Sequence, residues 1–121
     1  MQIVIKGELA DLNTIIDYAK TNRYKYADLK KTNTNMVAWQ AKRLPKMQRV
    51  YLKIHWYCKD KRKDPDNIAG GGTKFICDGL VKAGVIKNDG WSEIEGIEHS
   101  FDIDRQNPRI EIFIEEFKKE K

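Results

Sequence analysis

A run of alternating apolar and polar residues between Val50 and Tyr57 is the feature that most constrains the fold of this chain. Apolar side chains occupy every second position of the run, at Val50, Leu52, Ile54 and Trp56. Successive side chains of a strand point to opposite faces, so this period predicts a strand with one face in a core and one amphipathic face. This run is the best strand signal in the chain.

The residues before this strand predict a short strand followed by helix. Ile3 and Ile5 alternate with polar neighbours, which is typical of a strand. Apolar residues then recur at helical spacing after Asp11, whose side chain is placed to cap the helix. Residues 21–44 are predicted to be helical, with a break at 32–34 where threonine and asparagine gather.

The residues after the central strand predict one helix and two strands. An apolar stripe predicts a helix over 73–83 that ends at Gly84, a natural position for positive φ. The glycines at 70–72 weaken the start of a helix, so the first regular turn is predicted only after them. Alternating runs at 97–103 and 110–114 predict the last two strands, followed by a charged tail.

This order of elements predicts an α+β domain in which helices pack on a small mixed sheet of about four strands. A chain of 121 residues can bury one core, so residues 1–121 are expected to form a single domain. The sequence contains no apolar run of membrane-spanning length and no signal-peptide layout, so we expect a cytoplasmic protein. Cys58 and Cys77 lack the spacing of a zinc or redox pair and are interpreted as reduced core residues rather than a disulfide.

Charge is distributed unevenly along the chain. The net charge is +5, and basic residues gather between 42 and 63, where Asp60 is the only acid. The residues after Asp89 are rich in aspartate and glutamate. On charge alone, a solvated face and a nucleic-acid surface are equally good interpretations. The candidates for DNA contact lie at the end of the basic run: Lys59, Lys61, Arg62 and Lys63.

Two aspartates follow the basic run directly. Asp64 and Asp66 flank Pro65, whose ring biases Asp64 toward an extended conformation. In an extended segment both carboxylates point the same way and can share one magnesium ion, which usually takes only one or two protein carboxylates. The competing interpretation is a loop with a helix cap, in which Asp66 and Asn67 lie in the turn before the helix. This is the commoner meaning of so short a motif.

A lysine and two more acids lie later in the chain. Lys74 and Asp78 are four residues apart, so they share one helix face and can either form an ordinary ion pair or face a metal site together. Asp89 lies in a turn and would be the third acid, brought back after the helix. In phosphodiester hydrolysis the acids would hold the metal, and Lys74 would stabilise negative charge or position the attacking water.

In this order the motifs resemble the RusA family of Holliday junction resolvases, which are small crossover junction endodeoxyribonucleases frequent in phages and prophages. The matching elements are Asp64-Pro65-Asp66-Asn67, Lys74, Asp78-Gly79-Leu80, Lys82-Ala83-Gly84 and Asn88-Asp89. The spacing from Asp66 to Lys74 is about one helical turn longer than in the family pattern, with residues 70–73 absorbing the difference, and an added turn conserves the helix phase. Residues 1–44 have no residue-by-residue match.

The resemblance implies magnesium-dependent cleavage of branched DNA by a homodimer, with manganese as a substitute metal. It implies that Asp64, Asp66 and Asp89 are metal-binding catalytic acids that converge on one ion, and that Lys74 is the catalytic lysine. Asp78 is a further candidate ligand. Two alternatives stay open: a non-catalytic module that binds branched DNA, and a metal-stabilised domain that binds a partner and has no salt-sensitive affinity for DNA.

Overall fold

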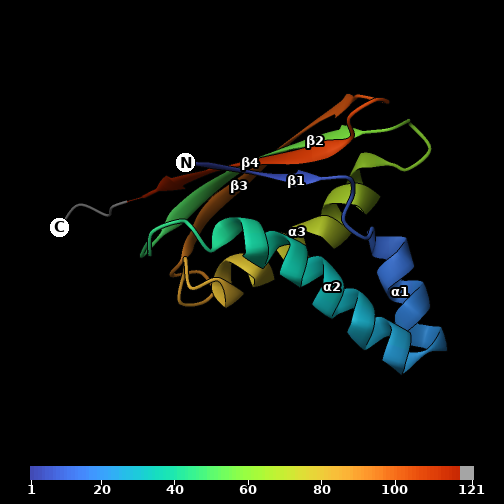
Figure 1. Cartoon of the computed structure of the whole chain (residues 1–121), viewed down its shortest axis with the longest axis horizontal. Helices are drawn as coiled ribbons and strands as arrows, with labels where there is room; N and C mark the ends of the chain where they lie inside the picture. Colours follow the sequence, from blue (N-terminus) through green and yellow to red (C-terminus); the bar gives the residue numbers. More distant parts are fainter. Residues whose placement is uncertain (118–121) are drawn as a thin grey trace.

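The computed structural model describes residues 1–117, in which three helices pack on one face of a four-stranded sheet (Figure 1). The strands are β1 (Gln2–Lys6), β2 (Val50–Cys58), β3 (Ile94–Ile103) and β4 (Arg109–Glu116), and the helices are α1 (Leu12–Thr21), α2 (Arg23–Ala41) and α3 (Pro65–Lys82). This arrangement confirms the predicted α+β class and the predicted mixed sheet. The charged tail predicted after the last strand falls mainly on residues 118–121, which lie outside the described residues.

The strand order across the sheet is β1-β4-β2-β3. β2 and β3 are parallel and are joined through α3, whereas β4 runs antiparallel to both β1 and β2. In this register Tyr57 pairs with Arg109, Cys58 pairs with Ile103, and Lys6 pairs with Arg109. The loops that follow β1, β2 and β3 therefore all lie at the same end of the sheet.

The core lies between the sheet and the helices. Ile54, Trp56 and Ile112 point from the sheet into this layer and are almost completely buried. Phe75 and Leu80 of α3 meet them from the other side and are completely buried. Within residues 1–117 no helix covers the opposite face of the sheet, as Figure 1 shows, and no helix is long and apolar enough to cross a membrane. Cys58 and Cys77 are both free thiols.

The predicted break at 32–34 is wrong, because α2 runs without interruption from Arg23 to Ala41. Asn33 at the expected break is buried, and its side chain is satisfied on both sides. Its amide group donates to the Leu29 carbonyl oxygen over 2.8 Å, and its Oδ1 accepts from the Ala10 backbone N–H over 2.9 Å. Asn33, which was taken as a sign of a helix break, thus connects α2 to the segment before α1.

The predicted start of the third helix is also wrong, because α3 begins at Pro65 and runs through all three glycines. A β-carbon at Gly72 would lie 2.6 Å from the Trp56 ring, and one at Gly79 would lie 2.5 Å from the Val37 side chain. A side chain at either position would clash with a neighbouring element. The close approach therefore explains why glycine is present although it is a weak helix former. The predicted end is confirmed, since Gly84 has a φ of 80°.

Candidate active site

The three loops at one end of the sheet are held together by backbone hydrogen bonds. The Asp104 N–H donates to the Cys58 carbonyl oxygen over 2.8 Å, and the Gly7 N–H donates to the Pro108 carbonyl oxygen over 2.9 Å. Two pockets open on either side of the loop after β2. Both are lined by Cys58, Asp60, Lys63 and Ile68, so the basic loop lies between two hollows, and Asp64 lines the second of them.

The two leading aspartates lie at the exposed start of α3. Asp64 occupies the N-cap position with an extended backbone, but its side chain makes no cap hydrogen bond. Asp66 lies in the first turn, where its Oδ1 accepts from the Asn67 N–H over 2.9 Å. Neither carboxylate forms a salt bridge with any side chain of residues 1–117. Both are therefore open to solvent and to ligands.

The expectation that both carboxylates point the same way rested on an extended segment. Because helix begins at Pro65, Asp66 has helical geometry, and residues two apart on a helix do not face each other. The donor chemistry still fits a magnesium ion, which binds oxygen ligands and completes its shell with water and substrate phosphate. The geometry favours one carboxylate, or two after a small adjustment, rather than a rigid protein cage.

Lys74 and Asp78 lie further along the same helix, and Asp89 lies in the loop that follows it. The pKa of the Cys77 thiol is raised to about 11, mainly by burial and also by the charges of Asp89 and Asp78, while Lys74 opposes the rise. Lys74, Asp78 and Asp89 therefore all lie near Cys77. At 1.5 Å per residue, Cys77 is about 16 Å along the helix axis from Asp66. The structure thus separates the predicted acids into two groups.

The described residues do not by themselves gather the three predicted acids around one point, so their sharing of one ion stays a prediction. Among residues 1–117 no group of three or more histidine, cysteine, aspartate or glutamate side chains is arranged to hold a metal. Lys74 lies about 12 Å along the axis from Asp66, but helical side chains lean toward the N-terminus, which brings its ammonium group closer to the first turn.

All four cations of the basic loop are exposed, but one of them is held in a close ion pair. Lys59, Lys61 and Arg62 are exposed, and the Arg62 side chain is 88% exposed although its Nε lies 3.7 Å from Asp60 Oδ2. Lys63 instead turns inward, and its Nζ lies 2.8 Å from Asp11 Oδ2 and 3.6 Å from a carboxylate oxygen of Glu8. Three of the predicted DNA contacts are thus available to phosphate, and the fourth is paired.

Asp11 was predicted as a helix cap, and that role is confirmed, but its second role was not predicted. Its Oδ1 accepts from the Thr14 N–H over 2.7 Å, while its Oδ2 holds Lys63. Burial alone would raise the pKa of Asp11, but the hydrogen bonds from Lys63 and Thr14 outweigh burial and lower it. The hydrogen bond to Asp11 raises the pKa of Lys63, against the opposing effect of partial burial. Nothing in the local sequence pattern signals this long-range ion pair.

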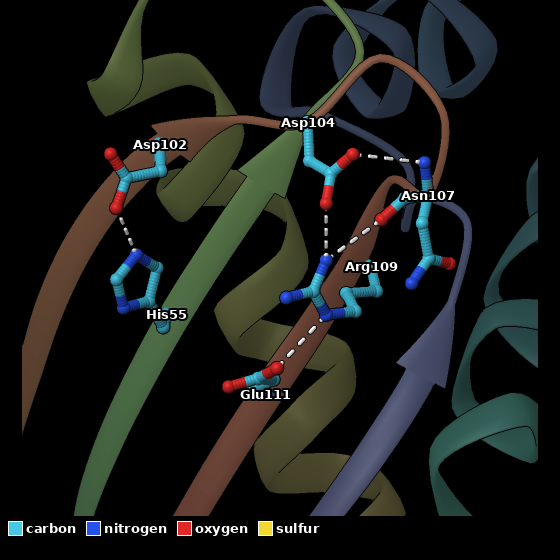
Figure 2. A network of polar contacts seen from close by, with 6 residues as sticks. All are labelled: His55, Asp102, Asp104, Asn107, Arg109 and Glu111. Carbon is cyan, nitrogen blue, oxygen red and sulfur yellow. Dashed lines mark hydrogen bonds and ion pairs between the residues drawn. The ribbon is translucent and has the colours of Figure 1, made fainter.

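A further polar network lies on the open face at the same end of the sheet (Figure 2). Arg109 donates to Asp104 Oδ2 over 2.8 Å, to Glu111 Oε2 over 2.9 Å and to the Asn107 carbonyl oxygen over 3.0 Å, and its guanidinium group lies 3.8 Å from the Tyr57 ring centroid. The hydrogen bond from Arg109 lowers the pKa of Asp104. This network fixes the turn between β3 and β4, which in turn contacts the end of β2.

The family comparison covers nearly the whole described chain. A family model described as endodeoxyribonuclease RusA matches residues 11–115, a range that includes the basic loop and every predicted site residue. No curated protein matches the chain closely enough to count as a relative. Because the family model spans far more than half of the sequence, the chain belongs to the RusA endodeoxyribonuclease family.

Proposed function

We propose that this protein is a metal-dependent endonuclease that resolves four-way DNA junctions by hydrolysing phosphodiester bonds. One observation carries the proposal in a chain of this family. The exposed carboxylates of Asp64 and Asp66 follow directly after the exposed cations of the basic loop, at one end of the sheet. A cationic surface attracts the DNA backbone, and exposed carboxylates beside it are the ligands that a phosphate-bound divalent ion needs.

In this proposal each part of the site has a separate task. Lys59, Lys61 and Arg62 bind backbone phosphates and set the position of the DNA strand. Asp64 and Asp66 would hold a magnesium ion, or manganese in its place, and such an ion supplies charge neutralisation and an activated water when bound. Lys74 stabilises the negative charge that develops on the phosphate oxygens.

Asp89 and Asp78 have weaker support as metal ligands. Their place in the family pattern is the reason to keep both as proposed site residues. In a single chain they lie near Cys77 and not at the first turn of α3. We therefore assign the first metal contact to Asp64 and Asp66 and treat Asp89 as a catalytic acid whose contribution has to be measured.

We also propose that the active form is a homodimer. A four-way junction has two-fold symmetry, and its resolution requires two paired cuts in opposite strands. Two copies of the site, related by a two-fold axis, match that requirement. Sedimentation of the free protein and of its junction complex tests the proposal: a monomer that cuts both strands with normal kinetics would contradict it.

The second candidate is a module that binds branched DNA without cutting it. The separation of the acids within one chain favours this candidate, because the described residues hold no ready-made three-acid group. It keeps the salt-sensitive DNA affinity of the basic loop but needs no metal chemistry. The two candidates differ in one outcome, which is strand cleavage.

The deciding experiment compares three labelled substrates of matched sequence: a synthetic four-way junction, a fork and a linear duplex. Each is incubated with the protein in magnesium, manganese or a chelator. Resolution by paired nicks in the junction with either metal, and none with the chelator or in linear duplex, supports the endonuclease. Salt-sensitive junction binding without nicks in either metal supports the binding module, and no salt-sensitive DNA affinity would contradict both.

A further inference from the structure

Two side-chain contacts connect the start of α1 to both sides of the Asp64-Pro65-Asp66 segment. On the side before it, Lys63 Nζ lies 2.8 Å from Asp11 Oδ2. On the side after it, the Asn67 Oδ1 accepts from the Asn13 backbone N–H over 2.9 Å. The residues that carry the proposed catalytic carboxylates are thus held between two contacts with an element that is more than 50 residues away in sequence.

The side chains of the segment have few other restraints, although the Asp64 carbonyl oxygen accepts from the Asn67 and Ile68 N–H groups in the first turn of α3. Asp64 makes no cap hydrogen bond, and Pro65 has no N–H to donate. Residues 61–66 are all exposed, so packing does not fix them. The partner on the other side is rigid by contrast: Asp11 is only 4% exposed, caps α1 through Thr14, and lies against the backbone of α3 at Gly71.

We propose that Asp11 is a positioning residue for the catalytic carboxylates, acting through Lys63 to hold the loop before α3 in its productive conformation. This inference rests on the proposed endonuclease function and adds a role for the N-terminal segment. It also reassigns Lys63 from a DNA contact to a structural partner. A loop fixed from one side by an ion pair with the buried Asp11 and from the other by Asn67 keeps Asp64 and Asp66 in place at little conformational cost.

The two oxygens of Asp11 have separate partners, which allows the positioning role to be separated from the capping role. In Asp11→Asn the remaining oxygen can still accept from the Thr14 N–H, because asparagine is as good an N-cap as aspartate. The new amide N–H group then faces the Lys63 ammonium group. Because two donors cannot form a hydrogen bond with each other, the contact between residues 11 and 63 is lost. Lys63→Met cuts the same contact without touching the cap, and the double variant Asp11→Asn/Lys63→Met removes both charges together.

The matched control is Asp17→Asn, which removes one exposed charge from the same helix. For each variant four quantities are measured: the thermal midpoint, the dissociation constant for a four-way junction without divalent ions, kcat at saturating junction with magnesium, and amide hydrogen exchange over residues 60–68. We expect Asp11→Asn and Lys63→Met each to lower kcat about tenfold and to speed exchange of 60–68. Junction affinity should stay within twofold of wild type, and Asp17→Asn should match wild type in all four measurements.

The two single variants and the double variant together test the proposal even if one of them folds poorly. The double variant contains no unpaired buried charge, and its kcat should equal that of either single variant, because one contact is lost in all three. Unchanged kcat and exchange in Asp11→Asn or in the double variant would overturn the proposal. So would a Lys63→Met variant that loses junction affinity at unchanged kcat, since Lys63 would then be a phosphate contact.

Failure of this inference can be told apart from failure of the proposed function. If the wild type cuts no junction in magnesium or manganese, the endonuclease proposal is wrong. The exchange measurement would then still report whether Asp11 holds the loop. If the wild type cuts junctions and the variants cut equally well, only the positioning role is wrong.

Discussion

A β-carbon at Gly71 would lie 2.4 Å from the backbone carbonyl carbon of Asp11, because α3 passes directly against the segment that starts α1. The nearest atoms at this position are backbone and cannot move aside. At the neighbouring Gly70 the nearest atom is the end of the Leu12 side chain, 3.3 Å away, and Leu12 is 40% exposed. Backbone atoms therefore exclude a side chain at Gly71, whereas a side chain at the adjacent Gly70 would meet only a side chain that can move.

Alanine at these two positions should have opposite effects on stability. Gly71→Ala should lower the free energy of unfolding by about 1–3 kcal/mol, because the added methyl group forces α1 and α3 apart. Gly70→Ala should leave it unchanged or raise it by up to about 1 kcal/mol, since alanine favours helix and Leu12 can move. Urea unfolding of the two variants measures both changes. Equal effects would show that the close approach at Gly71 is not real.

These glycines also show how far the sequence predicts the fold. Trp56 and its alternating neighbours predicted the central strand correctly, because period-two burial is a local signal. Gly71 was taken as a weak helix position, because the backbone of Asp11 that excludes a side chain there is 60 residues away in sequence. Local propensity was outweighed by a tertiary contact that no window of the sequence contains.

The candidate site was predictable to a similar degree. The order of Asp64, Asp66 and Lys74 pointed to the family that the match over residues 11–115 then showed. Their arrangement in space was not predictable, because the convergence of Asp89 depends on how the chain returns after α3. The pairing of Lys63 with Asp11 likewise depends on where the N-terminal helix packs, and charge patterning alone made Lys63 look like its exposed neighbours.

Stability should fall in mild acid through His99. The Trp56 indole Nε1–H donates to His99 Nδ1 over 3.0 Å, so the ring is neutral at this nitrogen, and partial burial lowers the pKa of His99 below 6.5. In the unfolded chain the imidazole takes up a proton at higher pH than in the folded chain. The free energy of unfolding therefore falls as pH drops below about 6.5 and levels off beneath the folded pKa.

His99→Gln provides the control for that pH dependence. Glutamine can accept the Trp56 hydrogen bond but does not titrate, so the variant should lose less stability than the wild type between pH 7.5 and pH 5. Urea unfolding at both pH values makes the comparison. The same loss in both proteins would show that His99 is not the group responsible.

The basic loop should determine how strongly junction binding depends on salt. Replacing Lys61 and Arg62 by alanine should weaken junction affinity and reduce the slope of log K against log salt by about 2, because two phosphate contacts are lost. The exposed Lys20 and Lys25, changed together to alanine, are the charge-matched control. Equal loss of slope in both double variants would indicate a general charge effect and no contact by the loop.

Lys74 should affect the chemical step and not DNA binding. Lys74→Ala is expected to lower kcat about 100-fold, since it removes one charge that stabilises the transition state. Lys74→Arg should recover part of that loss. Single-turnover cleavage at saturating protein gives the rate directly, and a loss that appears only in junction affinity would make Lys74 a binding residue.

The most direct test of the account is the cleavage rate of Asp66→Asn on a four-way junction with magnesium. This change keeps the shape and the hydrogen bond of Asp66 Oδ1 to the Asn67 N–H but removes the carboxylate charge. We predict that kcat falls at least about 100-fold while junction affinity stays within twofold, and that Asp28→Asn, an exposed acid of α2, cuts at the wild-type rate. Full cleavage by Asp66→Asn would contradict the assignment of the active site to the start of α3.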